Sequence, residues 1–235
     1  MATRPQPEQH APPVQRLRVK YAKRGRARFT SHRDFGRAFE RALRRAGVPM
    51  AYSSGFSPHP RISYANAAPT GAASEAEYLE IGLAEACDPA AVQAALDAAL
   101  PPGLDIVEVV VAPPGTLADR LTGSRWRAEL VGVSTEDQHA AVTRFLAEPE
   151  VRVARMTKNG LREFDARGAV VDLEPTEEGL TMTLAHGVPL VRPDDVLTGL
   201  SRVWPAFAPR EVPVLTRLTQ GTLDPVTGSV ADIGC

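Results

Sequence analysis

Apolar and polar positions alternate along the first part of the chain. From residue 15 onward, Leu17, Val19 and Tyr21 alternate with arginine and lysine, which is the two-residue period of a strand with one basic face. Gly25 lies in the short segment that follows and indicates a turn. The pattern therefore predicts a strand that ends before the next change of period.

Helical spacing begins after this turn. Ser31 is a favoured N-cap residue, and Asp34 lies three positions later, where a capping-box acid is expected. One apolar stripe with helical spacing then comprises Phe35, Phe39, Ala42, Leu43 and Ala46. Gly47 is typical of a residue just beyond a helix end.

The rest of the chain completes this first series of strands and helices and then repeats it once. Strand-like segments follow at 49–54, 61–67, 74–84 and 104–112, with a helix at 88–100. A second series comprises strands at 124–133, 151–160 and 211–221, a hairpin at 168–187, and helices at 134–148 and 191–204. The series predict an α+β protein of two tandem ferredoxin-like (β-α-β-β-α-β) units.

The pattern also divides the chain. We expect a disordered leader at 1–13, the first unit at 14–112, a linker at 113–123, the second unit at 124–220 and a flexible tail at 221–235. The leader is rich in proline and polar residues and lacks the apolar core of a secretory signal. No apolar run approaches the roughly 20 residues of a membrane-spanning helix, so no membrane partner is expected.

Only two cysteines, Cys87 and Cys235, occur among the 235 residues. This count disfavours a disulfide framework and predicts a cytoplasmic protein. It also excludes an iron–sulfur cluster held by this chain alone, because such clusters take about four thiolates. No cofactor is expected within the chain, and no metal site is predicted.

The net charge of −1 conceals a strong asymmetry. The segment 14–62 holds 13 of the 27 Arg and Lys residues but only two of the 28 Asp and Glu residues. A basic block on an acidic body is typical of a protein that binds a polyanion or an acidic protein surface. A solvated cationic face balanced by the acidic half of the same chain is the simpler alternative.

Arginines repeat every fourth position along the predicted helix at 31–47 and form a ridge that core packing does not require. Sheets of this class commonly bind single-stranded RNA through exposed aromatic residues beside basic ones. The expected RNA contacts are Lys23, Arg28, Arg37, Arg41, Arg44, Arg45 and Arg61, with stacking by Tyr52, Phe56 and Tyr64. In the alternative interpretation several of these aromatic residues, with Tyr21 and Phe29, belong to the core.

A histidine between two prolines marks the loop that follows the basic helix. Pro58 and Pro60 restrict the backbone around His59, and Gly55 permits the preceding turn. Neighbouring arginines favour a neutral imidazole, so His59 and His32 are candidate general acids or bases. Loop fixation by His59 and a helix-start role for His32 are the alternatives.

Other candidate positions are weaker. Acidic residues at 74–80 either form ion pairs with the arginines of the same chain or lie on a solvated strand edge. The segment 156–168 is either a hairpin tip or a second polyanion contact. The secondary residues are Ser31, Asp34, Glu75, Glu77, Lys158, Arg162, Asp165 and Arg167.

A long run of motifs resembles the radical-SAM-linked proteins, a family with a domain of unknown function. The family pattern reads K-x-G-x-x-R-F-x-S-H-x-D, then R-A-x-R-R-A-G, G-F-x-P-H-P and S-E-x-E-Y. Matching segments here are 23–34, 41–47, 55–60 and 74–78, with weaker similarity around 157–168. Arg33 and Gly36 depart from the pattern, because bulkier apolar residues are more usual there.

The resemblance implies a partner and leaves the reaction open. That partner would be a radical-SAM protein, which would carry the iron–sulfur cluster, S-adenosylmethionine and, in some cases, cobalamin. We therefore expect a non-catalytic module that recognises RNA, such as tRNA or rRNA, with no DNA partner. The alternatives are a metal-independent endoribonuclease that uses His59 or His32, and a protein–protein adaptor with a basic docking face.

Overall fold

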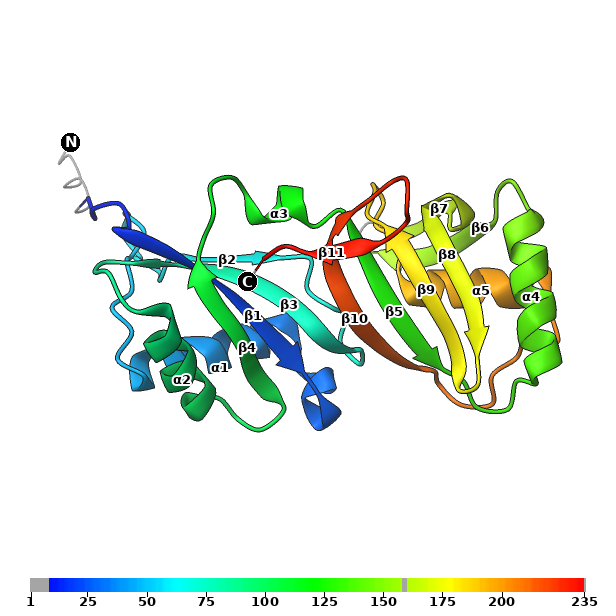
Figure 1. Ribbon diagram of the computed structural model, residues 1–235, viewed down its shortest axis with the longest axis horizontal. Helices are drawn as coiled ribbons and strands as arrows, with labels where there is room; N and C mark the ends of the chain where they lie inside the picture. Colours follow the sequence, from blue (N-terminus) through cyan, green and yellow to red (C-terminus); the bar gives the residue numbers. More distant parts are fainter. Residues whose placement is uncertain (1–8, 158–159, 235) are drawn as a thin grey trace. The chain divides into compact units, whose positions relative to one another are not determined.

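The computed structural model describes residues 9–157 and 160–234, which form two compact units. The first unit contains the described residues up to Thr70 and residues 76–118, and the second contains residues 71–75 and 119–234. Both units combine helices with mostly antiparallel strands (Figure 1). In the described ranges, no helix is both long and apolar enough to cross a membrane.

The first unit has the element order β-α-β-β-α-β. Its elements are β1 (Gln15–Lys23), α1 (His32–Arg45), β2 (Ile62–Ala65), β3 (Ala73–Leu83), α2 (Pro89–Ala99) and β4 (Leu104–Val111). A 3-10 helix at Gly25–Phe29 joins β1 to α1. The strands are ordered β4-β1-β3-β2, with antiparallel pairing of β1 with β4 and of β2 with β3.

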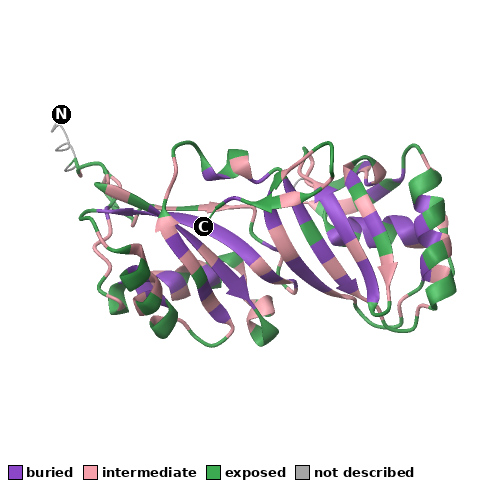
Figure 2. Ribbon diagram, viewed as in Figure 1, coloured by how far each residue is buried: buried purple, intermediate pink, exposed green. Residues whose placement is uncertain are grey.

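The core of this unit lies between the sheet and its two helices (Figures 1 and 2). The apolar stripe of α1 faces inward, with Phe39 fully buried and Phe35 only 3% exposed. Tyr21 on β1 also belongs to this core, and its ring stacks on Phe35 with centroids 4.3 Å apart. The core interpretation of Tyr21 is therefore correct.

The second unit repeats the order with an inserted hairpin. Its main elements are β5 (Gly123–Glu129), α4 (Thr135–Ala147), β8 (Val170–Thr176), β9 (Gly179–Ala185), α5 (Pro193–Val203) and β10 (Val214–Leu223). The strands are ordered β10-β5-β9-β8, and the pairs are antiparallel. Residues Ala73 and Ser74, at the start of β3, pair in parallel with β10.

Four segments differ from the sequence prediction. The predicted strand at 49–54 forms only isolated bridges, Met50 with Leu83 and Tyr52 with Pro60. β6 (Arg152–Thr157) pairs with β7 (Gly160–Asp165) in a separate two-stranded sheet, and the predicted linker contains a short helix, α3 (Leu117–Arg120). The predicted tail is not frayed over its described part, because β11 (Val230–Asp232) pairs with β10. Residues 158 and 159, near the end of the predicted strand at 151–160, lie outside the described residues.

A half-buried histidine, His186, joins segments of the second unit that lie far apart in the sequence. The Nδ1 of His186 lies 2.7 Å from the backbone oxygen of Leu121, and Nε2 lies 2.9 Å from Oγ of Ser124. Trp126 Nε1 donates to the same hydroxyl at 2.8 Å. The backbone oxygen of Leu121 can only accept a hydrogen bond, so the proton of the neutral ring lies on Nδ1. Nε2 then accepts a hydrogen bond from the Ser124 hydroxyl.

This arrangement predicts a specific acid sensitivity. Burial lowers the pKa of His186 below its ordinary value, so the unfolded chain binds a proton more readily than the folded one. Stability from this group is present above pH about 6.5 and is lost as the pH falls below that value. When the pH falls from about 7.5 to about 5.5, we expect the free energy of unfolding, measured with urea, to decrease less in His186→Gln than in the native chain. Equal losses would contradict this role.

Candidate nucleic-acid interface

The arginine ridge of α1 has a defined starting point. Ser31 Oγ accepts a hydrogen bond from Asp34 N at 3.2 Å and donates to Asp34 Oδ2 at 2.7 Å. The two side chains thus fix the first turn, as their capping positions predict. Their role is structural, because they fix the residue at which α1 begins.

The exposed face of α1 presents five arginines, Arg33, Arg37, Arg41, Arg44 and Arg45. Arg44 approaches Glu40 at 4.0 Å, and Arg45 donates to the backbone oxygen of Ala99 at 3.3 Å. The other three make no ion pair or hydrogen bond with the residues that the structure describes. They lie at successive four-residue intervals, which places them along one side of the helix.

An aromatic side chain lies exposed just before this helix. Phe29, in the 3-10 helix, is 59% exposed, and the guanidinium carbon of Arg28 lies 4.7 Å from its ring centroid. Phe29, unlike Tyr21, therefore lies outside the core. An exposed ring with an adjacent guanidinium is suited to stacking on a nucleobase.

The Pro-His-Pro loop is closed at its base. Ser53 N donates to the backbone oxygen of His59 at 2.9 Å, and His59 N donates to Ser53 Oγ at 3.0 Å. Arg61 Nε donates to the backbone oxygen of Tyr52 at 3.1 Å. Phe56 at the tip is 69% exposed. The loop is thus held at Ser53–His59 and presents its tip to solvent.

The described end of the predicted leader also contacts this loop. His10 N donates to Ser54 Oγ at 3.0 Å, and the rings of His10 and Tyr52 have centroids 6.5 Å apart. Tyr52 is 39% exposed, so it remains accessible for stacking. The proline-rich composition of the leader gave no signal for this contact.

The two candidate catalytic histidines have different surroundings. The ring of His32 packs edge-on against Tyr64, with centroids 4.8 Å apart, whereas His59 is fixed through its backbone. Among the described residues neither imidazole forms a hydrogen bond, and no group of three metal-ligating side chains occurs. A general base is usually oriented by such a bond, and the described residues supply none to either ring.

Tyr64 packs beneath α1. Its hydroxyl is buried without a hydrogen-bond partner in the described structure, and a Cβ at Gly36 would lie 3.5 Å from it. Burial, with a smaller effect of Glu40, raises the pKa of Tyr64 to about 12. The glycine that departs from the family pattern therefore leaves room for this ring.

We expect Tyr64→Phe to raise the free energy of unfolding by about 1 kcal/mol, because it removes a buried polar group that gains no bond. Urea unfolding of the variant measures this change. Tyr52→Phe is the control, since that side chain is exposed and its variant is expected to match the native chain. A loss of stability in Tyr64→Phe would indicate that the hydroxyl has a partner.

Two predicted site residues are structural instead. Lys23 is only 5% exposed, and its Nζ lies 3.5 Å and 3.4 Å from the backbone oxygens of Ala68 and Pro69. Glu77 is 2% exposed and accepts from Ala68 N at 2.9 Å. Both side chains hold the loop before β3, so the predicted phosphate contact at Lys23 is wrong.

The remaining secondary candidates do not form one site. Asp165 accepts from the backbone N–H groups of Val151, Arg167 and Gly168, and Arg167 donates to the backbone oxygen of Val170 at 3.0 Å. These contacts are those of a structural turn. Arg162 is exposed on β7, Glu75 is half-buried, and Lys158 lies outside the described residues.

A family model covers most of these elements. It describes an uncharacterized protein conserved in bacteria, DUF2344, and matches residues 16–193. The chain belongs to this family. The DUF2344 match includes α1, the Pro-His-Pro loop and the second unit as far as the start of α5. No curated protein matches the chain. A crystal structure of an unknown protein from Galdieria sulphuraria is 20% identical, covers 86% of this chain and 98% of its own, and has a TM-score of 0.25.

In the DUF2344 chain, Glu80 pairs with two arginines of β1 in a cluster that the sequence did not predict. Glu80 Oε2 lies 2.6 Å from Arg16 Nη2, and Glu80 Oε1 lies 3.0 Å from Arg18 Nη2. The side chain of Arg18 is fully buried and that of Glu80 is 2% exposed. The alternating pattern predicted that Arg16 and Arg18 share one strand face, and Glu80 was among the candidate acidic partners. Nothing in the sequence indicated that Arg18 and Glu80 would be buried.

Proposed function

We propose that this chain is a non-catalytic module that recognises RNA and presents it to a radical-SAM enzyme. The observation that carries the RNA part is the arginine row of α1, Arg33, Arg37 and Arg41, which is unpaired within the described residues. Guanidinium groups bind phosphate through paired N–H donors. Three of them along one helix side match successive phosphates of a nucleic-acid backbone.

Exposed aromatic residues supplement this charge. Phe29 and Phe56 are 59% and 69% exposed, beside basic residues and on turns that the 3-10 helix and the Ser53–His59 contacts define. Stacking on an aromatic ring contributes roughly 1–3 kcal/mol per base and does not depend strongly on sequence. Single-stranded RNA with accessible bases is therefore the favoured ligand.

The proposal extends to the architecture. Both units are proposed to be ferredoxin-like, because each has the order β-α-β-β-α-β and the strand order 4-1-3-2 after the inserted hairpin is set aside. The radical-SAM partner rests on the sequence motifs, and that partner would supply the iron–sulfur cluster that two cysteines cannot hold.

The test is binding of the full chain to total cellular RNA across a salt series, with the RNA examined on a gel. RNA recognition predicts affinity that falls linearly with salt on logarithmic axes and RNA that remains intact. Cleavage would favour the endoribonuclease, and His59→Ala would then abolish cutting without loss of binding. Absence of binding near physiological salt would overturn both RNA functions and favour the protein adaptor.

A further inference from the structure

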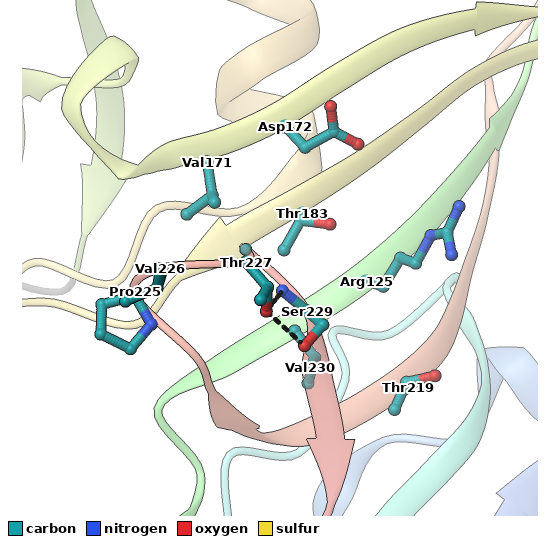
Figure 3. Close-up of a pocket in the computed structure, with 11 residues that line it drawn as sticks. Arg125, Val171, Asp172, Thr183, Thr219, Pro225, Val226, Thr227, Ser229 and Val230 are labelled. Atoms are coloured by element: carbon teal, nitrogen blue, oxygen red, sulfur yellow. Dashed lines mark hydrogen bonds between the residues drawn. The ribbon is translucent and has the colours of Figure 1, made fainter.

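We propose that the second unit binds a small organic anion in a pocket on the sheet face opposite to α4 and α5. The pocket has a volume of about 590 Å³. It is lined by residues from four strands and by the segment 225–230 (Figure 3). Small-molecule sites typically measure roughly 300–1,000 Å³, so the volume suits a metabolite or a single nucleotide.

The floor of the pocket is a polar row across neighbouring strands. Asp172 on β8 lies opposite Thr183 on β9, Thr183 lies opposite Arg125 on β5, and Arg125 lies opposite Thr219 on β10. Neighbouring residues of β5, such as Trp126, are buried on the helix side, so alternation directs Arg125 to the other face. Figure 3 shows Arg125, Thr183 and Asp172 rising from three adjacent strands.

The segment after β10 forms a pre-arranged wall. Asp224 Oδ1 accepts from Val226 N at 2.8 Å and from Thr227 N at 3.3 Å, and these bonds hold the pKa of Asp224 below its usual range. Thr227 Oγ1 and Ser229 Oγ lie 2.8 Å apart. A Cβ at Gly228 would lie 3.0 Å from Val171 Cγ1, so the wall approaches β8 closely.

The charges of the pocket have no partners in the part of the chain that the structure describes. Arg125 and Asp172 form no hydrogen bond or ion pair there, although both line the same space. A guanidinium with nearby hydroxyls is a receptor for phosphate or carboxylate. The carboxylate of Asp172 would accept from a hydroxyl or amine elsewhere on the ligand.

This combination defines the ligand class. The molecule carries an anionic group for Arg125 and a hydroxyl or amino donor for Asp172. Valine side chains from Val171, Val226 and Val230 add apolar contact. Nucleoside 5′-monophosphates and free α-amino acids share this chemistry and differ in their anion. The lining residues all belong to the second unit, so the proposal does not rest on the proposed RNA function of α1.

The experiment uses isothermal titration calorimetry of the full chain with two probe sets, the common nucleoside 5′-monophosphates and the standard α-amino acids. We expect saturable binding of a member of one set, which identifies the anion as phosphate or carboxylate. Arg125→Leu is expected to weaken this binding by about tenfold to a hundredfold, and Asp172→Asn to weaken it in the same direction.

The matched control is Arg127→Leu. Arg127 lies two residues along β5, outside the pocket lining, and its Nε lies 3.5 Å from Glu129 Oε1. Its variant is expected to bind as the native chain does. The proposal is overturned if neither probe set binds, or if Arg125→Leu binds as well as the control. Circular dichroism of each variant checks that the fold is retained.

Discussion

Replacing Glu80 with alanine is expected to lower the free energy of unfolding by about 3–5 kcal/mol. The substitution leaves the guanidinium of Arg18 charged and fully buried without its 3.0 Å carboxylate partner. Arg16 loses the same partner but is half-exposed, so water can solvate it. The loss therefore comes mainly from desolvation of Arg18 and not from the number of bonds removed.

The comparison that isolates burial uses another Arg–Glu pair. Glu129→Ala removes the partner of Arg127, whose side chain is 41% exposed, and is expected to cost less than about 1 kcal/mol. Urea unfolding of both variants measures the difference. Similar losses in the two variants would contradict the argument from burial. Replacing Arg18 and Glu80 together by apolar residues should recover much of the loss.

The double variant Arg37→Ala/Arg41→Ala is expected to weaken RNA binding about tenfold at about 0.15 M salt. Both side chains are exposed, so the fold should not change. Each phosphate contact with single-stranded RNA contributes roughly 0.7 to the logarithmic salt slope, so the slope should fall by about 1.4. A salt titration by filter binding reports affinity and slope together.

A control with the same change in charge is Arg127→Ala/Arg144→Ala. Arg127 is half-buried and Arg144 is exposed, and they already approach Glu129 and Glu148, each at 3.5 Å. If RNA is attracted only by overall charge, both double variants will bind alike, and the α1 interface will be ruled out. If α1 is the interface, the control will keep the native affinity and salt slope.

The helix face was predictable because its spacing is a local property. Phe35 and Phe39 fall on one stripe and the arginines on another, and the structure buries the first and exposes the second. The error at Lys23 was avoidable. Lys23 shares the two-residue register of Leu17 and Tyr21, so the alternation itself assigns it to the buried side.

Other features depend on contacts between distant segments. The burial of Arg18 requires Glu80, which lies 62 residues away in the sequence, and no local period encodes that pairing. The three residues of β11 are too few to display a period, so the pocket wall at 225–230 had no signal. That Arg125 has no ion-pair partner in the described ranges likewise depends on its neighbours in space.

The contacts between Ser53 and His59 close the intervening segment at its base and so isolate it from the strands on either side. The backbone of this segment is joined at its base, so residues 54–58 can change without altering the strands on either side. Gly55, Phe56 and Pro58 in this segment belong to the motif G-F-x-P-H-P, so substitutions at the tip would probe that motif while the scaffold is retained.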